Sequence, residues 1–389
     1  MTLRKLATLA VAAAVSTMPF PIVRAVAATV PAPVTGTAQA QGVRFYNVGA
    51  QGCDAQDTPD APARAFRDGS GTIHLFAAAS VDRAMTGRSF NTLKHDCSVV
   101  FQGEKSGNPA DFDDADWLTS FWVMDGRTVF AIIHDEFHGW EHPGQCPSGD
   151  PSRCIATSLL GAISNDGGQH FYSVPGNAAL GATPPYRYDP NQSAGFSYGN
   201  PTNIMKRGAY YYVMFNSQDP FASGHDGVCI GRTANLLDPA AWRIWDGSGF
   251  NIRSSDPYTT AIADPDKVGC HPVVPATGPG YAGSLSFLPS RRVYVLAMYS
   301  FGQDGNGKRA GTYILTSADL LHWSQPQLLL ADDAIPSNQG GHQYYPSLID
   351  PNSPDPNFGT IGRHPILFTT SEATDAADWS LWGRQVSLR

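Results

Sequence analysis

The stretch WLTSFWVMDGRTVFAII, residues 117–133, contains two apolar runs on either side of Asp125-Gly126. Both runs are rich in β-branched and aromatic side chains, which favour extended strands. An Asp-Gly pair between two such runs is typical of a tight hairpin turn, because Gly adopts positive φ without steric cost. The stretch therefore predicts an antiparallel β-hairpin.

The same plan occurs five times along the chain. Each copy has a polar start, an apolar strand, a turn, and a second strand that ends in polar residues. The copies span residues 62–77, 117–133, 200–215, 283–299, and 345–350 continued by 364–370. Polar turns that end in an aromatic residue follow three of them, at 164–171, 233–242 and 317–323, and mark the joint between third and fourth strands. Five four-stranded units about 60–85 residues apart predict an all-β fold, a five-bladed β-propeller with antiparallel blades.

The composition agrees with a globular protein of strands and turns. The chain of 389 residues has 39 Gly, 30 Pro and 11% aromatic residues, and only 15% of its residues are charged. A disordered chain would have fewer aromatics and more charge, and a helical bundle would be rich in Glu and Lys. Only four of the 34 acidic residues are Glu. A Glu at an expected site is therefore less easily explained by chance.

Two of the turns carry a resemblance to known families. DGGQHF at 166–171 matches the Asp-box of sialidases, and SADLLHW at 317–323 resembles the turn of five-bladed glycosidases of the arabinanase, xylosidase and invertase type. The resemblance implies the blade plan over most of the chain. It is a resemblance of fold, because both motifs are structural. At two of the three catalytic positions of that family the chain differs, since PARA stands at 62–65 and YGNP at 198–201.

The first residues predict export. Residues 1–28 have a basic start at Arg4 and Lys5, a short apolar run and small residues suited to cleavage, as in a secretory signal. A membrane anchor is the alternative, but Pro19 and Pro21 interrupt the run. Residues 29–42 are expected to be a disordered spacer, and residues 43–389 a single propeller domain. The predicted location is secreted or periplasmic, with no membrane contact after cleavage of the signal.

Six cysteines also fit an exported protein. Proximity favours Cys146–Cys154, and the remaining pairs are then taken as Cys53–Cys97 and Cys229–Cys270. A zinc site is the other interpretation, but no C-x-x-C pair occurs. Loss of three basic residues with the signal changes the net charge from −8 to −11. A nucleic acid or an anionic membrane is therefore not an expected partner.

Propeller geometry predicts which residues meet on one face. The residues just before the first strand and just after the second strand of each unit cluster around the axis. The expected substrate-binding residues are Arg64, Arg83, His134, His138, Asn200, Asn216, Tyr299, His342, Tyr345 and Glu372. Carboxylates, amides and aromatic rings of this kind suit a carbohydrate.

Glycosidic bond hydrolysis needs two carboxyl groups. We expect Glu136 to be the general acid, with Asp116 or Asp135 as base or modulator, in a glycoside hydrolase that acts on a poly- or oligosaccharide. The simpler interpretations are a solvated turn at Asp116, a loop cap at Asp135 and an exposed carboxylate at Glu372.

Two other functions stay open from the sequence. A polysaccharide lyase would use His138 and Tyr345 for β-elimination, with Arg64 or Arg83 neutralising a uronic acid. A non-catalytic glycan-binding propeller would need no catalytic residues. No cofactor is expected; His134, His138 and His142 recur every four residues, which leaves a three-His zinc site or a structural Ca²⁺ as alternatives. The protein is expected to be a monomer.

Overall fold

The computed structural model describes residues 30–77, 79–174, 182–221, 224–276, 280–302, 309–373 and 375–389. Almost all regular structure in them is β-strand, and α1 (Val48–Gln51) is the one α-helix there. The predicted all-β fold is confirmed. The secretory signal predicted for residues 1–28 lies outside the described residues. None of the helices in the described part of the chain is long and apolar enough to cross a membrane.

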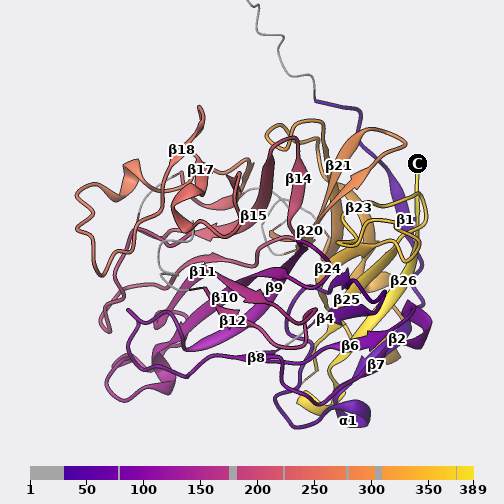
Figure 1. The fold of residues 1–389 in the computed structure, drawn as a ribbon, viewed down its shortest axis with the longest axis horizontal. Coiled ribbons are helices and arrows are strands. Elements are labelled where there is room, and N and C mark those ends of the chain that lie inside the picture. Colours follow the sequence, from indigo (N-terminus) through magenta and orange to yellow (C-terminus); the bar gives the residue numbers. More distant parts are fainter. Residues whose placement is uncertain are drawn as a thin grey trace, which may run out of the picture.

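The strands form five consecutive antiparallel groups along the chain (Figure 1). The first group is β3 (Arg64–Arg67), β4 (Ile73–Phe76), β6 (Met85–Gly87) and β7 (Lys94–His95), with β5 (Val81–Asp82) paired to β8 (Phe101–Gln102). The second is β9 (Ala115–Val123), β10 (Val129–His138), β11 (Ile155–Ser164) and β12 (Tyr172–Ser173). The third is β13 (Phe196–Gly199), β14 (Met205–Arg207), β15 (Tyr210–Gln218), β16 (Gly227–Thr233), β17 (Arg243–Trp245), β18 (Phe250–Ile252) and β19 (Val274–Pro275).

The last two groups complete the chain. The fourth is β20 (Tyr281–Leu288), β21 (Val293–Ser300), β22 (Gly311–Ser317) and β23 (Gln327–Ala331). The fifth is β24 (Gln343–Ile349), β25 (Ile366–Ser371) and β26 (Ser380–Leu388), joined by β1 (Gly36–Ala38) and β2 (Val43–Asn47). Short 3₁₀ helices connect the strands: η1 (Phe90–Thr92), η2 (Gly139–Glu141), η4 (Pro239–Ala241), η5 (Pro265–Lys267), η6 (Asp332–Ala334), η7 (Ser337–Gln339) and η8 (Ala376–Asp378).

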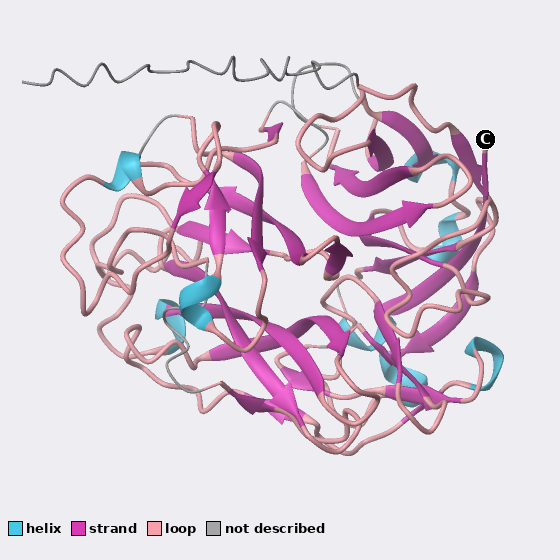
Figure 2. Cartoon of the chain, turned by 45° about the horizontal axis from the view of Figure 1, so that its top comes forward, coloured by secondary structure: helices cyan, strands magenta, loops and turns pink. Residues whose placement is uncertain are grey.

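All five predicted hairpins are present, as the pairs β3–β4, β9–β10, β14–β15, β20–β21 and β24–β25. The groups stand around a common centre, as expected for a propeller (Figure 2). The second and third groups are not separate sheets, because β13 pairs in parallel with β11 and antiparallel with β15. Sheet pairing therefore does not confirm the predicted number of five blades.

Hydrogen bonds between neighbouring groups form a closed ring around the centre. Each bond joins a side chain of one group to the backbone of another: Leu118 N donates to Asp82, Ser120 Oγ to Thr202 O, Leu285 N to Asn203 Oδ1, Leu348 N to Ser284 Oγ, and Ser347 Oγ to Ala63 O. The ring runs through all five groups in order and returns to the first. The inner strands are therefore fixed to one another without continuous sheet pairing.

The ends of the chain close the fifth group, where the structure differs from the expected spacer. Residues 36–38 form β1, which pairs with β26 at the C-terminal end, and β2 pairs with the same strand. Val34 is fully buried in the core. The small, uncharged composition of residues 30–42 suggested a flexible linker, but small residues also pack closely beside a neighbouring strand.

The polar turns lie where the sequence places them, between third and fourth strands. Asp166 Oδ1 accepts hydrogen bonds from the backbone N–H groups of Gln169 and His170, and Asp319 Oδ1 does the same for Leu321 and His322. All three predicted disulfides are present, with Cα–Cα distances of 5.6 Å for Cys53–Cys97, 5.5 Å for Cys146–Cys154 and 6.1 Å for Cys229–Cys270.

Arg64 is a buried cation whose guanidinium contacts three other groups of the ring. Its guanidinium donates to Pro201 O at 2.8 Å, Gly283 O at 2.6 Å and Ser347 Oγ at 3.1 Å, which belong to the third, fourth and fifth groups. Burial lowers the pKa of Arg64 to about 9. The side chain therefore joins the first group to three others through one planar donor set.

Replacing Arg64 by Met should lower the free energy of unfolding by about 3 kcal/mol or more, because two buried carbonyl groups lose their donor. Urea denaturation measures the change. Arg363→Met is the matched control, since Arg363 is exposed, and it should change the midpoint little. A stability equal to that of the wild type for Arg64→Met would contradict the role given to this side chain.

Candidate functional site

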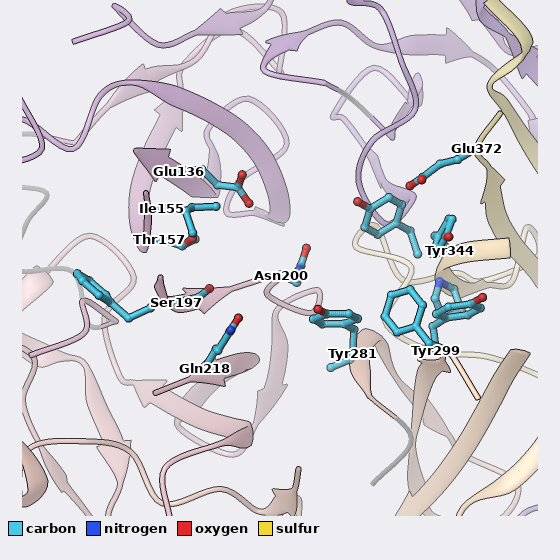
Figure 3. A pocket seen from close by; sticks show the side chains of 15 residues that line it. Glu136, Ile155, Thr157, Ser197, Asn200, Gln218, Tyr281, Tyr299, Tyr344 and Glu372 are labelled. Atoms are coloured by element: carbon cyan, nitrogen blue, oxygen red, sulfur yellow. The ribbon is translucent and has the colours of Figure 1, made fainter. Parts of the chain in front are cut away.

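A pocket of about 370 Å³ lies where the inner strands of the groups meet (Figure 3). Its polar lining consists of carboxylates, amides and hydroxyl groups, from Glu136, Glu372, Asn200, Gln218, Thr157 and Ser197. Its aromatic lining consists of Phe196, Tyr281, Tyr299, Phe301, Tyr344 and Tyr345. The second to fifth groups contribute these residues, so the pocket depends on four of the five groups. We call it the axial pocket.

The two carboxylates, Glu136 and Glu372, stand on opposite sides of the axial pocket. Figure 3 shows Glu136 beside Thr157, and across the cavity Glu372 beside Tyr344. Asn200 lies between these sides, and Gln218 lies beside Ser197 on the side of Glu136. A sugar ring in the space would meet carboxylates and amides at its hydroxyl groups and aromatic faces at its C–H groups.

Alternation along β10 brings three residues of one face together. His134, Glu136 and His138 are two positions apart, so their side chains project from the same side of the strand. Glu136 Oε1 lies 3.1 Å from His134 Nε2, and Oε2 lies 2.9 Å from His138 Nε2. The carboxylate is therefore held between two imidazoles.

The other nitrogen of each imidazole has a partner of its own. Asn200 N donates to His134 Nδ1 at 3.4 Å, which leaves Nε2 facing Glu136 Oε1. His138 Nδ1 lies 3.2 Å from Glu141 Oε1, which places His138 between two carboxylates. Burial lowers the pKa of His138, but the hydrogen bonds and charges of Glu136 and Glu141 outweigh burial and raise it.

Glu136 is ionised by this arrangement. Burial alone would raise the pKa of Glu136, but the hydrogen bonds and charges of His134 and His138 lower it far below its ordinary value. A general acid must carry a proton near the working pH. The expected role of Glu136 as the acid is therefore not the role that its surroundings favour, whereas a base or nucleophile fits them.

Asp60 is a carboxyl group of opposite character at the same site. Tyr345, which lines the axial pocket, donates from its hydroxyl to Asp60 Oδ1 at 2.9 Å. Burial raises the pKa of Asp60 to about 7, and the charges of Glu136 and Glu372 add to the effect against the Tyr345 hydrogen bond. Burial also raises the pKa of Glu372. Asp60 can thus carry a proton where Glu136 cannot.

Two pocket residues have left-handed backbone conformations. Asn200 has φ of 47° and Tyr345 has φ of 56°. Tyr345 lies at an irregularity in the β24–β25 register between Tyr344 and Ser347, which turns its side chain toward Asp60. Such a conformation costs a bulky residue on the order of 1 kcal/mol, and strain of this kind clusters at functional sites.

Asp116 and Asp135 do not line the axial pocket. They face each other across the β9–β10 pair, and both are almost completely buried on the side of β10 opposite to Glu136. Burial raises the pKa of both carboxyl groups, and a hydrogen bond joins them. The pair thus lies inside the second group, outside the lining of the axial pocket.

Two of the expected binding residues, Asn216 and His342, support the pocket wall from behind, and two others, Arg64 and Arg83, lie outside the pocket lining. Asn216 Oδ1 accepts from Ala282 N at 2.9 Å, and Ala282 lines the pocket. His342 Nδ1 lies 3.0 Å from the hydroxyl of Tyr299, which itself lines the pocket and donates to Asp332 at 2.6 Å. Arg64 lies within the ring of inner strands, whereas Arg83 pairs with Asp54 in the first group.

The expected residues that line the axial pocket are Glu136, Asn200, Tyr299, Tyr345 and Glu372. His134 and His138 reach it through Glu136. Sequence reasoning passed over Asp60, Gln218 and Tyr281 as individual site residues. Tyr281 and Gln218 stand at strand ends, where the propeller rule could have found them. Asp60 has no such signal, because its partner Tyr345 is 285 residues away.

The three histidines do not converge as a metal site would require. His134 and His138 hold Glu136, while His142 Nε2 lies 3.0 Å from Asp114 Oδ2. Within the described ranges, the group with metal-ligand spacing is Cys53, Asp57 and His95. The sulfur of Cys53 is bonded to Cys97, so it offers no thiolate.

No protein-family model matches the chain, and no curated protein matches it. Solved structures are similar to it at low identity. The catalytic domain of a GH62 α-L-arabinofuranosidase from Coprinopsis cinerea is 10% identical over 92% of this chain and 98% of its own, with a TM-score of 0.46. An α-L-arabinanase from Cellvibrio cellulosa is 11% identical over 85% of this chain and 91% of its own, with a TM-score of 0.47.

A third similar structure is the sucrose-6-phosphate hydrolase from Lactobacillus gasseri. It is 12% identical over 84% of this chain, with a TM-score of 0.48, and the match spans 58% of the hydrolase. The arabinanase is of a type that the sequence resembles. At these values the likeness identifies no site residue and no substrate.

The Glu136–His138 contact predicts a measurable titration. His138 should titrate above the ordinary histidine range, and Glu136→Gln should lower its pKa because the neighbouring negative charge is removed. NMR of the imidazole nitrogens across pH measures both values. His170→Gln in an otherwise unchanged protein assigns an exposed histidine as the reference signal. An unchanged pKa of His138 in Glu136→Gln would contradict the contact.

Proposed function

We propose that this protein is a glycoside hydrolase that cleaves a poly- or oligosaccharide in the axial pocket. One observation carries the proposal: two carboxyl groups that interact electrostatically, Glu136 in the pocket lining and Asp60 behind the lining residue Tyr345, have pKa values shifted in opposite directions. Two histidines keep Glu136 ionised, whereas burial raises the pKa of Asp60 to about 7. Hydrolysis of a glycosidic bond needs one carboxylate and one carboxylic acid, and pKa values separated by their surroundings assign these roles.

The roles follow from the contacts. Asp60 donates its proton to the leaving oxygen, and the Tyr345 hydroxyl holds the Asp60 carboxyl group in place. Glu136 acts on the anomeric carbon, directly or by activating water, and the His134 and His138 contacts fix both of its oxygens. Glu372, on the far side of the pocket, binds sugar hydroxyl groups. The aromatic lining stacks on the sugar rings.

The lyase hypothesis has weaker support. Burial and the charge of Asp60 raise the pKa of Tyr345, and the pKa of His138 is raised as well, so neither group is a ready base at neutral pH. A uronic acid would also need a cation, but the described residues that line the axial pocket include no Arg or Lys. A binding protein without catalysis would not need carboxyl groups of opposite protonation.

We also propose that the protein works outside the cytoplasm, with a signal removed from residues 1–28. Three disulfides support this location, because disulfides persist in oxidising compartments.

Glu136→Gln and Asp60→Asn should each lower kcat on a cleaved glycan by about 10² to 10⁴-fold, because each removes one member of the acid–base pair. Release of reducing ends from a panel of arabinan, xylan, galactan and fructan is the assay. Glu104→Gln makes the same chemical change at an exposed Glu and should keep full activity. Glu372→Gln should raise KM more than it lowers kcat. Full turnover by Glu136→Gln would overturn the catalytic role of Glu136, and release of no reducing ends by wild type would overturn the hydrolase proposal.

The pH profile should fall on its alkaline side. Asp60 is active when protonated, so kcat/KM should decrease by about tenfold per pH unit above about 7. Tyr345→Phe removes a hydrogen bond that lowers the pKa of Asp60, and it should move the alkaline limb to higher pH. Initial rates from pH 4 to 10 test both statements. An alkaline limb that Tyr345→Phe leaves in place would assign the acid to another group.

A further inference from the structure

A second cavity, of about 710 Å³, lies outside the axial pocket. It is formed by the segments 185–192 and 257–262 together with Phe221. We call it the outer cavity. No part of the catalytic arrangement uses it.

The outer cavity is held in shape by bonds between its two segments. Arg187 Nε donates to Pro257 O at 2.6 Å, and Arg187 Nη2 donates to Tyr258 O at 3.1 Å. Tyr188 N donates to the Tyr258 hydroxyl at 3.0 Å. These bonds order the walls before any ligand arrives, which lowers the entropy that binding must overcome.

The two cavities share an aromatic wall. Phe196 lines the axial pocket, and its ring centroid lies 5.6 Å from that of Tyr186 and 6.1 Å from that of Phe221, which both line the outer cavity. Gln192 of the outer cavity donates to the backbone carbonyl of Ile155, which lines the axial pocket. A chain bound in one cavity is therefore within reach of the other.

The lining of the outer cavity suits a neutral sugar. Phe221 keeps 43% of its surface exposed, and it packs against Tyr186, so an aromatic face is available for stacking. Arg187, Asp189 and Thr260 are exposed around it and offer donors and acceptors for hydroxyl groups. One cation and one anion in the same lining favour a polar neutral ligand over a charged one.

We infer that the outer cavity binds further sugar units of a polysaccharide whose scissile bond lies in the axial pocket. This inference rests on the proposed glycoside hydrolase function and narrows its substrate from any glycoside to a polymer. Phe221 is the stacking residue, and the Tyr186–Phe196–Phe221 cluster connects the two cavities.

The test compares wild type with Phe221→Ala on the polysaccharide of the panel that wild type cleaves and on the aryl glycoside of the same sugar. Phe221→Ala should raise KM for the polymer about threefold to tenfold, since one stacking contact is lost, and leave the aryl glycoside unaffected. Tyr172→Ala removes an exposed aromatic residue elsewhere and should change neither value.

Equal KM values of wild type and Phe221→Ala on the polymer would overturn the inference, as would the same increase on both substrates. Neither result would contradict the hydrolase proposal, which fails only if wild type cleaves no glycan. In that case native gels that contain each polymer still test the cavity. Wild type should be retarded and Phe221→Ala less so, and equal mobility of the two proteins in every gel would refute the binding role.

Discussion

The hydrogen bonds of Arg64 are the interaction on which the site depends. Its guanidinium binds Pro201 O, Gly283 O and Ser347 Oγ, and each of these residues is the chain neighbour of a residue that lines the axial pocket: Asn200, Ala282 and Pro346. The chains approach so closely here that a β-carbon at Gly283 would collide with the Pro346 carbonyl. A rigid, five-donor cation thus sets the spacing of the inner strands, and this spacing sets the pocket. Arg64 acts beneath the pocket and not in it, although the propeller rule correctly placed it near the axis.

Local patterns explain what could be predicted from the sequence. Four of the five hairpins depend on residues within about 20 positions of one another, so repetition indicated the strands and the joints between them. Proximity indicated the Cys146–Cys154 disulfide for the same reason, whereas the other two disulfides join cysteines 44 and 41 residues apart and were taken as the remaining pairs. By contrast, the parallel pairing of β13 with β11 leaves no mark in the sequence. The pairing of β1 with β26 was equally hidden, because it joins the two ends of the chain.

The site was predictable only in part, and β10 shows why. HDEFH at 134–138 forms one polar cluster in the sequence. The alternation of side chains between the two sides of a strand says more, because it divides these residues into two sets. A strand places His134, Glu136 and His138 on one side and Asp135 on the other. The Glu136 carboxylate, which lies between the two histidines, is therefore separated from the buried Asp116–Asp135 pair. The protonation states depend on contacts between residues distant in the sequence. The hydrogen bond between Tyr345 and Asp60 depends on the register irregularity in β24, and no sequence pattern near Asp60 predicts it.

Burial acts on every carboxyl group at the site in the same direction, so partners decide the differences. Burial raises the pKa values of Asp60, Glu136 and Glu372 alike. Only Glu136 has two imidazoles within 3.1 Å, and their charge and hydrogen bonds reverse the shift. The negative charge of Glu136 then raises the pKa of Asp60 further, which helps Asp60 to keep its proton. The contacts of His134 and His138 therefore act on both members of the acid–base pair. They keep Glu136 ionised, and the charge of Glu136 helps to keep Asp60 protonated.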